Sequence, residues 1–178
     1  MRVIAGEFRG RRLQSPPGLD VRPTPDRLRE ALFNVLAPRI EGCVFVDAYA
    51  GTGSVGIEAL SRGAARVVFL EQSAAAVRAI RENLAALGVT ARAEVIRGKA
   101  APTVARLRAG IVFLDPPYRL AGEYDAALGA LGGEPPDLVV VQHHVKSAPA
   151  AEYRALSRVR LLKQGDNALS FYQPGTDP

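Results

Sequence analysis

The sequence predicts an α/β protein in which a mostly parallel β-sheet carries helices on both faces. Between residues 43 and 142, short apolar runs alternate with helix-forming stretches, and this alternation is typical of parallel strands joined by helical crossovers. The first apolar run ends in a glycine-rich turn of the kind that leads from a strand into a helix. After residue 156 two strand-like segments, 157–164 and 168–172, are separated only by Gly165-Asp166-Asn167. That spacing predicts an antiparallel hairpin at the end of the sheet.

Residues 1–22 are expected to form a basic N-terminal arm, separate from a main domain over residues 23–178. The arginines of this segment are Arg2, Arg9, Arg11, Arg12 and Arg22, against the two acids Glu7 and Asp20. Val3-Ile4-Ala5 and residues 11–14 flank a turn from Gly6 to Gly10, which predicts a short β-hairpin. An isolated hairpin is marginal in water, so either the main domain or a ligand has to order it. Two interpretations stay open, an arm that contacts RNA and a solvated terminus.

A helix is predicted to follow the arm, with Thr24 as its N-cap and Pro25 at the first helical position. Leu28 and Leu32 begin an apolar face at helical spacing, and Pro38 is expected to end the helix. The strands expected after it cover about residues 43–47, 66–71, 93–97, 111–114 and 138–142, and the helices between them about 54–62, 73–87, 102–107 and 121–131.

Composition restricts the classes of protein that this chain can represent. The formal net charge is +5, which favours a polyanionic partner such as nucleic acid. No apolar run approaches the ~20 residues of a membrane span, so no membrane contact is expected. One cysteine, Cys43, and two adjacent histidines are too few for a disulfide framework or a zinc site. These observations predict a cytoplasmic protein that binds no metal.

The apolar run Ile111–Leu114 is followed by Asp115-Pro116-Pro117-Tyr118. A proline has no N–H donor and disfavours helical geometry at the residue before it. The turn therefore offers a carboxylate and carbonyl oxygens as hydrogen-bond acceptors, beside the flat ring of Tyr118. Acceptors next to a stacking ring suit a planar group that bears an NH₂, such as a nucleobase amine. The alternative is an ordinary strand followed by a loop with two prolines.

The glycine-rich turn after residue 47 predicts a nucleotide-like cofactor. Gly51, Gly53 and Gly56 have the G-x-G-x-x-G spacing, and Glu71 lies twenty residues after Gly51, where an acid can accept hydrogen bonds from ribose hydroxyls. An NAD-dependent dehydrogenase and a turn without a ligand are both compatible with this spacing. Asp47, however, precedes the turn, and its negative charge disfavours a pyrophosphate. S-adenosylmethionine has a ribose, an ammonium group and a positively charged sulfur, and so satisfies each feature.

With these residues the chain resembles class I S-adenosylmethionine-dependent amino-methyltransferases, and more narrowly the bacterial 16S rRNA guanine-N2 methyltransferases of the guanine-966 type. The resemblance rests on residues 2–6, 9–11, 22–24 and 29–34, the glycine-rich turn, residues 60–64, residues 115–118, and Gly165-Asp166 followed by Phe171-Tyr172. It implies a Rossmann-like fold with a seven-stranded sheet whose last strand is antiparallel. It also implies S-adenosylmethionine as cofactor, and the small ribosomal subunit and its 16S rRNA as partner. A monomer is the expected oligomeric state.

The resemblance assigns roles to residues of this chain. It implies that the cofactor is bound by Asp47, Ala48, Gly51, Thr52, Gly53, Glu71 and Gln72. Catalysis is assigned to Asp115, Pro116, Pro117 and Tyr118, and RNA binding to Arg9, Arg11, Arg12, Arg22 and Arg27. The chain departs from the family twice, since Lys99 stands where an acid tends to contact the adenine amine, and Gln142 where an acid tends to follow the fifth strand.

Three other functions are compatible with parts of this pattern. The same chemistry acts on DNA bases or on a protein glutamine amide in other enzymes, although this chain has no room for a separate DNA-recognition domain. A non-catalytic RNA-binding assembly factor could retain the fold, but the intact sequence from Asp115 to Tyr118 argues against loss of catalysis. The dehydrogenase is the third, and no residue suited to hydride transfer is evident.

Overall fold

The computed structural model describes residues 1–15, 24–117 and 121–175. Within these residues eight strands form one sheet in the order β3-β2-β1-β4-β5-β8-β7-β6. The strands are β1 Val44–Asp47, β2 Arg66–Glu71, β3 Ala93–Arg97, β4 Ile111–Leu114, β5 Leu138–His144, β6 Glu152–Tyr153, β7 Leu156–Gln164 and β8 Asn167–Pro174. The helices are α1 Asp26–Ile40, α2 Ser54–Ser61, α3 Ala74–Leu87, the 3₁₀ turn η1 Thr90–Arg92, α4 Ala100–Val104 and α5 Ala121–Leu131.

The predicted α/β class is confirmed. Strands β1 to β5 are parallel, and β8 is antiparallel to both of its neighbours, β5 and β7. The sheet has one strand more than the predicted seven, because the two-residue β6 folds back on the start of β7. Arg154, with φ of 53°, makes the sharp turn between them.

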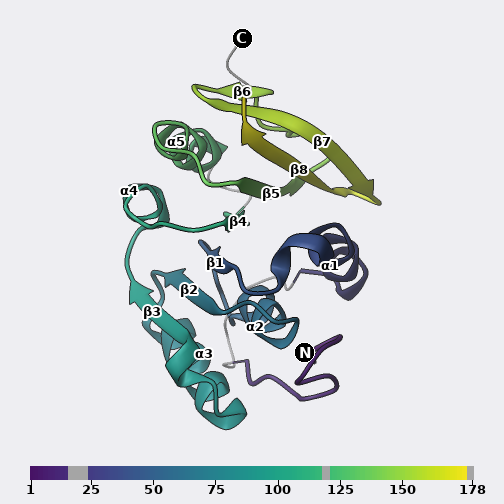
Figure 1. The fold of residues 1–178 in the computed structure, drawn as a ribbon, viewed down its shortest axis with the longest axis vertical. Coiled ribbons are helices and arrows are strands. Elements are labelled where there is room, and N and C mark those ends of the chain that lie inside the picture. Colours follow the sequence, from purple (N-terminus) through teal and green to yellow (C-terminus); the bar gives the residue numbers. More distant parts are fainter. Residues whose placement is uncertain (16–23, 118–120, 176–178) are drawn as a thin grey trace.

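Two hydrophobic cores cover the two faces of the sheet. One core contains α1, α2 and α3 packed on strand residues such as Phe45 and Phe113. The other contains α4 and α5 packed on the alternate residues, such as Val46 and Val112. Figure 1 shows α1 on one side of the sheet and α4 and α5 on the other. Burial on both faces explains why the parallel strands have continuous apolar runs and no polar alternation.

Helix α1 differs from its prediction at both ends. Pro25 occupies the N-cap position, no side chain caps the helix, and Thr24 lies outside it. The helix also continues through Pro38 to Ile40. Leu36 and Ile40 are both buried one turn apart, so packing of this last turn outweighs the hydrogen bond that Pro38 cannot donate. The short α4 begins earlier than predicted, at Ala100 instead of about residue 102.

The predicted N-terminal hairpin is present and packs on the main core. Arg2 pairs with Arg12 in an antiparallel bridge, and the Val3 N–H donates to the Arg11 carbonyl at 3.0 Å. Val3, Phe8 and Leu13 are buried in the same core as α1 and α2. Residues 1–15 are therefore ordered by the main domain. The boundary placed after residue 22 lies outside the described residues and stays a prediction.

A buried charged network joins the hairpin to α1 and α2. The fully buried Glu58 carboxylate accepts hydrogen bonds from the backbone N–H groups of Ile4 (2.8 Å) and Ala5 (3.0 Å) and from Arg62 Nε (2.8 Å). The Arg29 guanidinium, also fully buried, donates to the Arg2 carbonyl at 2.7 Å. Desolvation of Arg29 lowers its pKa, and the negative charge of Glu58 opposes this effect. Glu58 therefore holds the hairpin in place and compensates buried positive charge.

Replacing Glu58 by alanine is expected to lower the free energy of unfolding by about 3–5 kcal/mol, since the change leaves buried donors without their charged partner. Chemical denaturation measures this loss. Limited trypsin digestion should at the same time become faster at Arg9, Arg11 and Arg12, because the hairpin loses its anchor. The exposed Glu30 provides the matched control, Glu30→Ala. Equal stabilities and equal digestion rates for the two variants would contradict the anchoring role.

Candidate active site at the carboxyl ends of the parallel strands

Three carboxylates meet at one edge of the sheet. Asp47 is the last residue of β1, Glu71 the last residue of β2, and Asp115 follows the end of β4. Strand β1 pairs in parallel with both β2 and β4, so the three carboxyl ends are neighbours. Side chains alternate along a strand, which places all three acids on the face that α1, α2 and α3 cover. The sheet thus brings together the acids that the sequence placed on three separate segments.

The glycine-rich turn has positions that only glycine occupies without strain. Gly53, with φ of 79°, is the N-cap of α2, and this left-handed conformation favours glycine. A Cβ at Gly56 would lie 2.3 Å from a ring carbon of Phe69, so glycine allows α2 to approach β2. The Gly56 N–H donates to Asp47 Oδ2 at 2.9 Å. The turn therefore directs the start of α2 at the acidic edge.

Glu71 supports the turn from the neighbouring strand. Its Oε2 accepts from the Gly51 N–H at 2.8 Å, and its Oε1 accepts from the N–H groups of Gln72 (2.7 Å) and Ser73 (2.8 Å). An ionised carboxylate offers roughly four acceptor positions, so Glu71 retains capacity for one further donor. Ala48 and Thr52 of the predicted cofactor set are buried beside the turn, whereas Gln72 is exposed.

Asp47 and Asp115 share an unusual electrostatic environment. Burial raises the pKa of Asp47 to about 7, and the negative charge of Glu71 adds to this rise, while the Gly56 N–H opposes it. Burial likewise raises the pKa of Asp115 to about 7, with a further rise from the charge of Asp47. Within the described residues, no arginine or lysine forms an ion pair with any of the three acids. Acids without a basic partner suit a positively charged ligand.

The turn after β4 is described as far as Pro117. Asp115 is half-buried, Pro116 is buried and Pro117 is exposed. Thr24 Oγ1 lies 3.4 Å from Asp115 Oδ2, a contact that the sequence analysis missed because it assigned Thr24 to the helix cap. Two residues of the predicted site, Tyr118 and Arg22, lie outside the described residues.

The four predicted RNA-binding arginines that the structure describes lie at two separate places. Arg27 is exposed in the first turn of α1, close to the Thr24–Asp115 contact. The hairpin that carries Arg9, Arg11 and Arg12 packs instead against Ser61, at the end of α2 that is distant from the glycine-rich turn. Arg11 also donates to the Ala86 carbonyl near the end of α3. The hairpin therefore lies toward the opposite edge of the sheet from the acids.

The two departures from the family pattern have different surroundings. Lys99 is exposed at the N-terminus of α4, and its backbone carbonyl accepts from the Thr103 hydroxyl. Gln142 of β5 is buried on the strand next to Asp115, and its Oε1 has no hydrogen-bond partner among the described residues. A further contact, between the Tyr49 hydroxyl and Glu123 Oε2 at 2.8 Å, ties the glycine-rich turn to α5.

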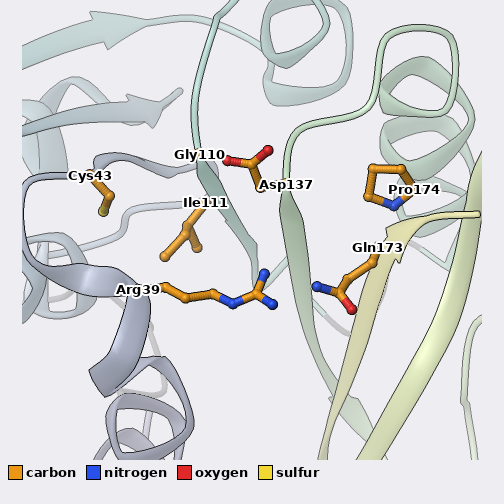
Figure 2. Close-up of a pocket in the computed structure, with 7 residues that line it drawn as sticks. All are labelled: Arg39, Cys43, Gly110, Ile111, Asp137, Gln173 and Pro174. Atoms are coloured by element: carbon orange, nitrogen blue, oxygen red, sulfur yellow. The ribbon is translucent and has the colours of Figure 1, made fainter.

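A pocket of about 560 Å³ lies at the other edge of the sheet, at the amino ends of β1, β4 and β5. It is lined by Arg39, Cys43, Gly110, Ile111, Asp137, Gln173 and Pro174, and Figure 2 shows the ends of Arg39 and Gln173 facing each other. The pocket is thus separate from the acidic site. Across the described ranges, no cluster of acids, histidines and cysteine suits a metal ion, and no helix is long and apolar enough to cross a membrane.

Comparisons with known proteins agree with this fold. The model of a family described as conserved hypothetical protein 95 matches residues 1–173. Ribosomal RNA small subunit methyltransferase D of Escherichia coli (strain K12) is 42% identical over 121 residues, which are 67% of this chain and 61% of that protein. The chain thus aligns with less than two thirds of the length of this relative.

Solved structures cover more of the chain. The structure of yhhF from Escherichia coli matches with a TM-score of 0.84 and 35% identity, over 98% of this chain and 97% of that chain. An RNA methyltransferase from Salinibacter ruber, solved in complex with S-adenosyl-L-homocysteine, matches with a TM-score of 0.69 over 88% of this chain and 96% of that chain. At 19% identity the second likeness shows the fold alone.

Proposed function

Because the chain belongs to the family of conserved hypothetical protein 95, we propose that it methylates ribosomal RNA of the small subunit, the activity that the name of its Escherichia coli relative gives for that protein. This membership confirms the family resemblance drawn from the sequence. The mostly parallel sheet with antiparallel last strands likewise confirms the expected class I methyltransferase fold.

S-adenosylmethionine is the methyl donor in this class, and the chemistry of the acidic edge fits it. The observation that carries the proposal is the convergence of Asp47, Glu71 and Asp115, which form no ion pair with a basic side chain among the described residues. When bound, this cofactor supplies a methyl group on a positively charged sulfur. Asp47 and the turn from Gly51 to Gly53 would hold its methionine end, and Glu71 would accept a hydrogen bond from its ribose.

We propose further that the acceptor is the exocyclic N2 amine of a guanine in 16S rRNA. Such an amine is a poor nucleophile, because its lone pair is delocalised into the ring. Asp115 and the Pro116 carbonyl would accept its two N–H bonds and so turn the lone pair toward the methyl group, with Tyr118 stacking on the base. Methyl transfer would form one N–C bond, break one S–C bond and release one proton from the nitrogen, and the ionised Asp115, which accepts one of the N–H bonds, would take up that proton.

Two physical effects would supply the rate. Holding nucleophile and methyl group in line contributes on the order of several kcal/mol. Acceptors fixed where positive charge develops on nitrogen add to this contribution. The target guanine has to leave its stack to reach the turn after β4. Arg27 would then hold phosphates near the site, and Arg9 and Arg12 would extend the contact along the face that carries α1 and α2.

Methyl transfer from radiolabelled S-adenosylmethionine tests the proposal with three acceptors: undermodified small subunits, their naked 16S rRNA, and plasmid DNA. Label in N2-methylguanosine of either ribosomal acceptor is the expected result, and it identifies the assembly state that the enzyme needs. Label in DNA would support the amino-methyltransferase reaction but contradict ribosomal RNA as the substrate. Cofactor binding without any transfer would instead indicate a non-catalytic RNA-binding factor.

A further inference from the structure

Thr24 has the sequence context of a helix cap, but its hydroxyl does not cap the helix. Thr24 and Pro25 precede Asp26, the first residue of α1, yet Pro25 is the N-cap and no described side chain accepts a capping hydrogen bond from a backbone N–H of the first turn. Thr24 is 6% exposed. Buried hydroxyl groups are almost always hydrogen-bonded in folded proteins, so the partner of this hydroxyl indicates its role.

The partner is the carboxylate of Asp115. Thr24 Oγ1 lies 3.4 Å from Asp115 Oδ2, across 91 residues of sequence. An ionised carboxylate only accepts hydrogen bonds, so the threonine hydroxyl is the donor. The last torsion of an aspartate side chain is broad and roughly two-fold. A single fixed donor therefore decides which oxygen faces α1 and which stays available on the open side of the turn.

We propose that Thr24 is a positioning residue for Asp115: its hydroxyl holds one carboxylate oxygen and leaves the other to accept from the substrate amine. This inference rests on the proposed function, in which Asp115 accepts an N–H bond of the amine. It gives the residue just before α1 a role in orienting the Asp115 carboxylate, although α1 itself carries none of the residues assigned to catalysis.

The charges around Asp115 give this contact a measurable consequence. Burial and the neighbouring charge of Asp47 both raise the pKa of Asp115, and the Thr24 hydroxyl is the group that opposes them. On the other neighbouring strand, β5, the adjacent residue Gln142 is neutral. Removing the hydroxyl is therefore expected to raise the pKa of Asp115 further. The acid-side fall of the pH–rate profile should then move to higher pH.

The test compares Thr24→Val, which removes the hydroxyl at similar size, with Thr24→Ser, which keeps it. Thr24→Val is expected to lower kcat by on the order of 10-fold near pH 7. The acidic limb of its kcat profile should move to higher pH, so that part of the lost rate returns at about pH 9. Thr24→Ser should restore most of the rate. Cofactor affinity should change by less than about 3-fold, since Thr24 contacts the acceptor side of the site. Thr90→Val, at an exposed position on η1, is the matched control.

A second readout separates this proposal from the proposed function. Carboxyl ¹³C NMR of the labelled protein, with the Asp115 signal assigned through Asp115→Asn, follows the titration of Asp115 without any substrate. A higher titration midpoint of Asp115 in Thr24→Val supports the contact even if the protein shows no methyl transfer. In that case the contact is supported and the proposed function is not. An active enzyme whose Thr24→Val variant keeps the wild-type midpoint and pH profile, with any rate loss equal at every pH, overturns the positioning role.

Discussion

Replacing Asp115 by alanine should reduce methyl transfer by on the order of 10³-fold, while S-adenosylmethionine binding stays within a few fold of the wild type. The change removes an acceptor aimed at the nitrogen where positive charge develops, and the loss of one such fixed group typically costs 10²–10³ in kcat. Cofactor binding is expected to survive because Asp47, Glu71 and the glycine-rich turn remain. Asp115→Asn should retain more activity than Asp115→Ala, since its amide oxygen still accepts one N–H bond.

Single-turnover methyl transfer and calorimetric titration of the cofactor measure the two quantities separately. Asp137→Ala is the matched control, because Asp137 is an exposed carboxylate at the opposite edge of the sheet. Two results contradict the assignment of Asp115. One is a loss of cofactor binding that parallels the loss of rate, which would make Asp115 a cofactor ligand. The other is equal activity of the Asp115→Ala and Asp137→Ala proteins.

The acidic edge was predictable from sequence because the direction of each strand follows from the helical crossovers of an α/β chain. Each of Asp47, Glu71 and Asp115 ends an apolar run, and the helices between the runs require parallel strands. Carboxyl ends of parallel strands share one edge, so the meeting of the three acids follows. The raised pKa of Asp47 does not follow, because it depends on how deeply the packing of α2 and the sheet buries one side chain.

The role of Thr24 illustrates what local patterns leave undetermined. Thr24-Pro25-Asp26 has good cap chemistry, and the sequence alone gives no reason to reject it. The hydroxyl instead bonds to a residue 91 positions away, because the packing of α1 on the sheet brings its start to the end of β4. Such a choice between two partners is made by tertiary structure. The extension of α1 past Pro38 has the same origin, in the burial of Ile40.

The charge of the N-terminal hairpin predicts a nucleic-acid contact, whereas its apolar residues indicate packing on the protein. Val3, Phe8 and Leu13 recur at intervals of five among the arginines, and all three are buried. This spacing was the available signal that one side of the hairpin packs on the protein. The anchor itself, Glu58, could not be recognised, because a single glutamate within an apolar helix has no local feature that identifies backbone N–H groups some 54 residues earlier as its partners.

Replacing Asp47 by asparagine should stabilise the ligand-free protein at pH 8 and weaken cofactor binding by on the order of 10²-fold. The pKa of Asp47 is raised to about 7 by burial, from an ordinary value near 4. Between these values the unfolded chain has lost a proton that the folded chain retains, so stability falls as pH rises. Above pH 7 the penalty is complete, with an upper limit of about 4 kcal/mol for a shift of this size.

Asparagine removes this penalty and still offers an oxygen to the Gly56 N–H. Its buried NH₂ group costs about 1–3 kcal/mol, so the expected net gain at pH 8 is about 1–2 kcal/mol. Below pH 4 Asp47 is protonated in both states, so the gain disappears and the cost of the buried NH₂ group should leave the variant less stable than the wild type. Denaturation at pH 8 and pH 4 measures the reversal, and Asp166→Asn, in the exposed β7–β8 turn, controls for the loss of one negative charge.

The same linkage predicts the direction of the pH dependence of cofactor binding. A cation requires the ionised form of Asp47, so affinity should rise with pH toward 7 and binding should release protons near pH 6. Calorimetry in two buffers of different ionisation enthalpy counts these protons, and the number should fall in Asp47→Asn. The contrary result is an Asp47→Asn variant that is less stable than the wild type at pH 8 and releases as many protons on cofactor binding. It would show that the Gly56 N–H and other local dipoles stabilise the ionised Asp47. Cofactor binding would then not depend on a destabilised carboxylate, and the acidic edge would bind the cofactor by shape and hydrogen bonds more than by charge.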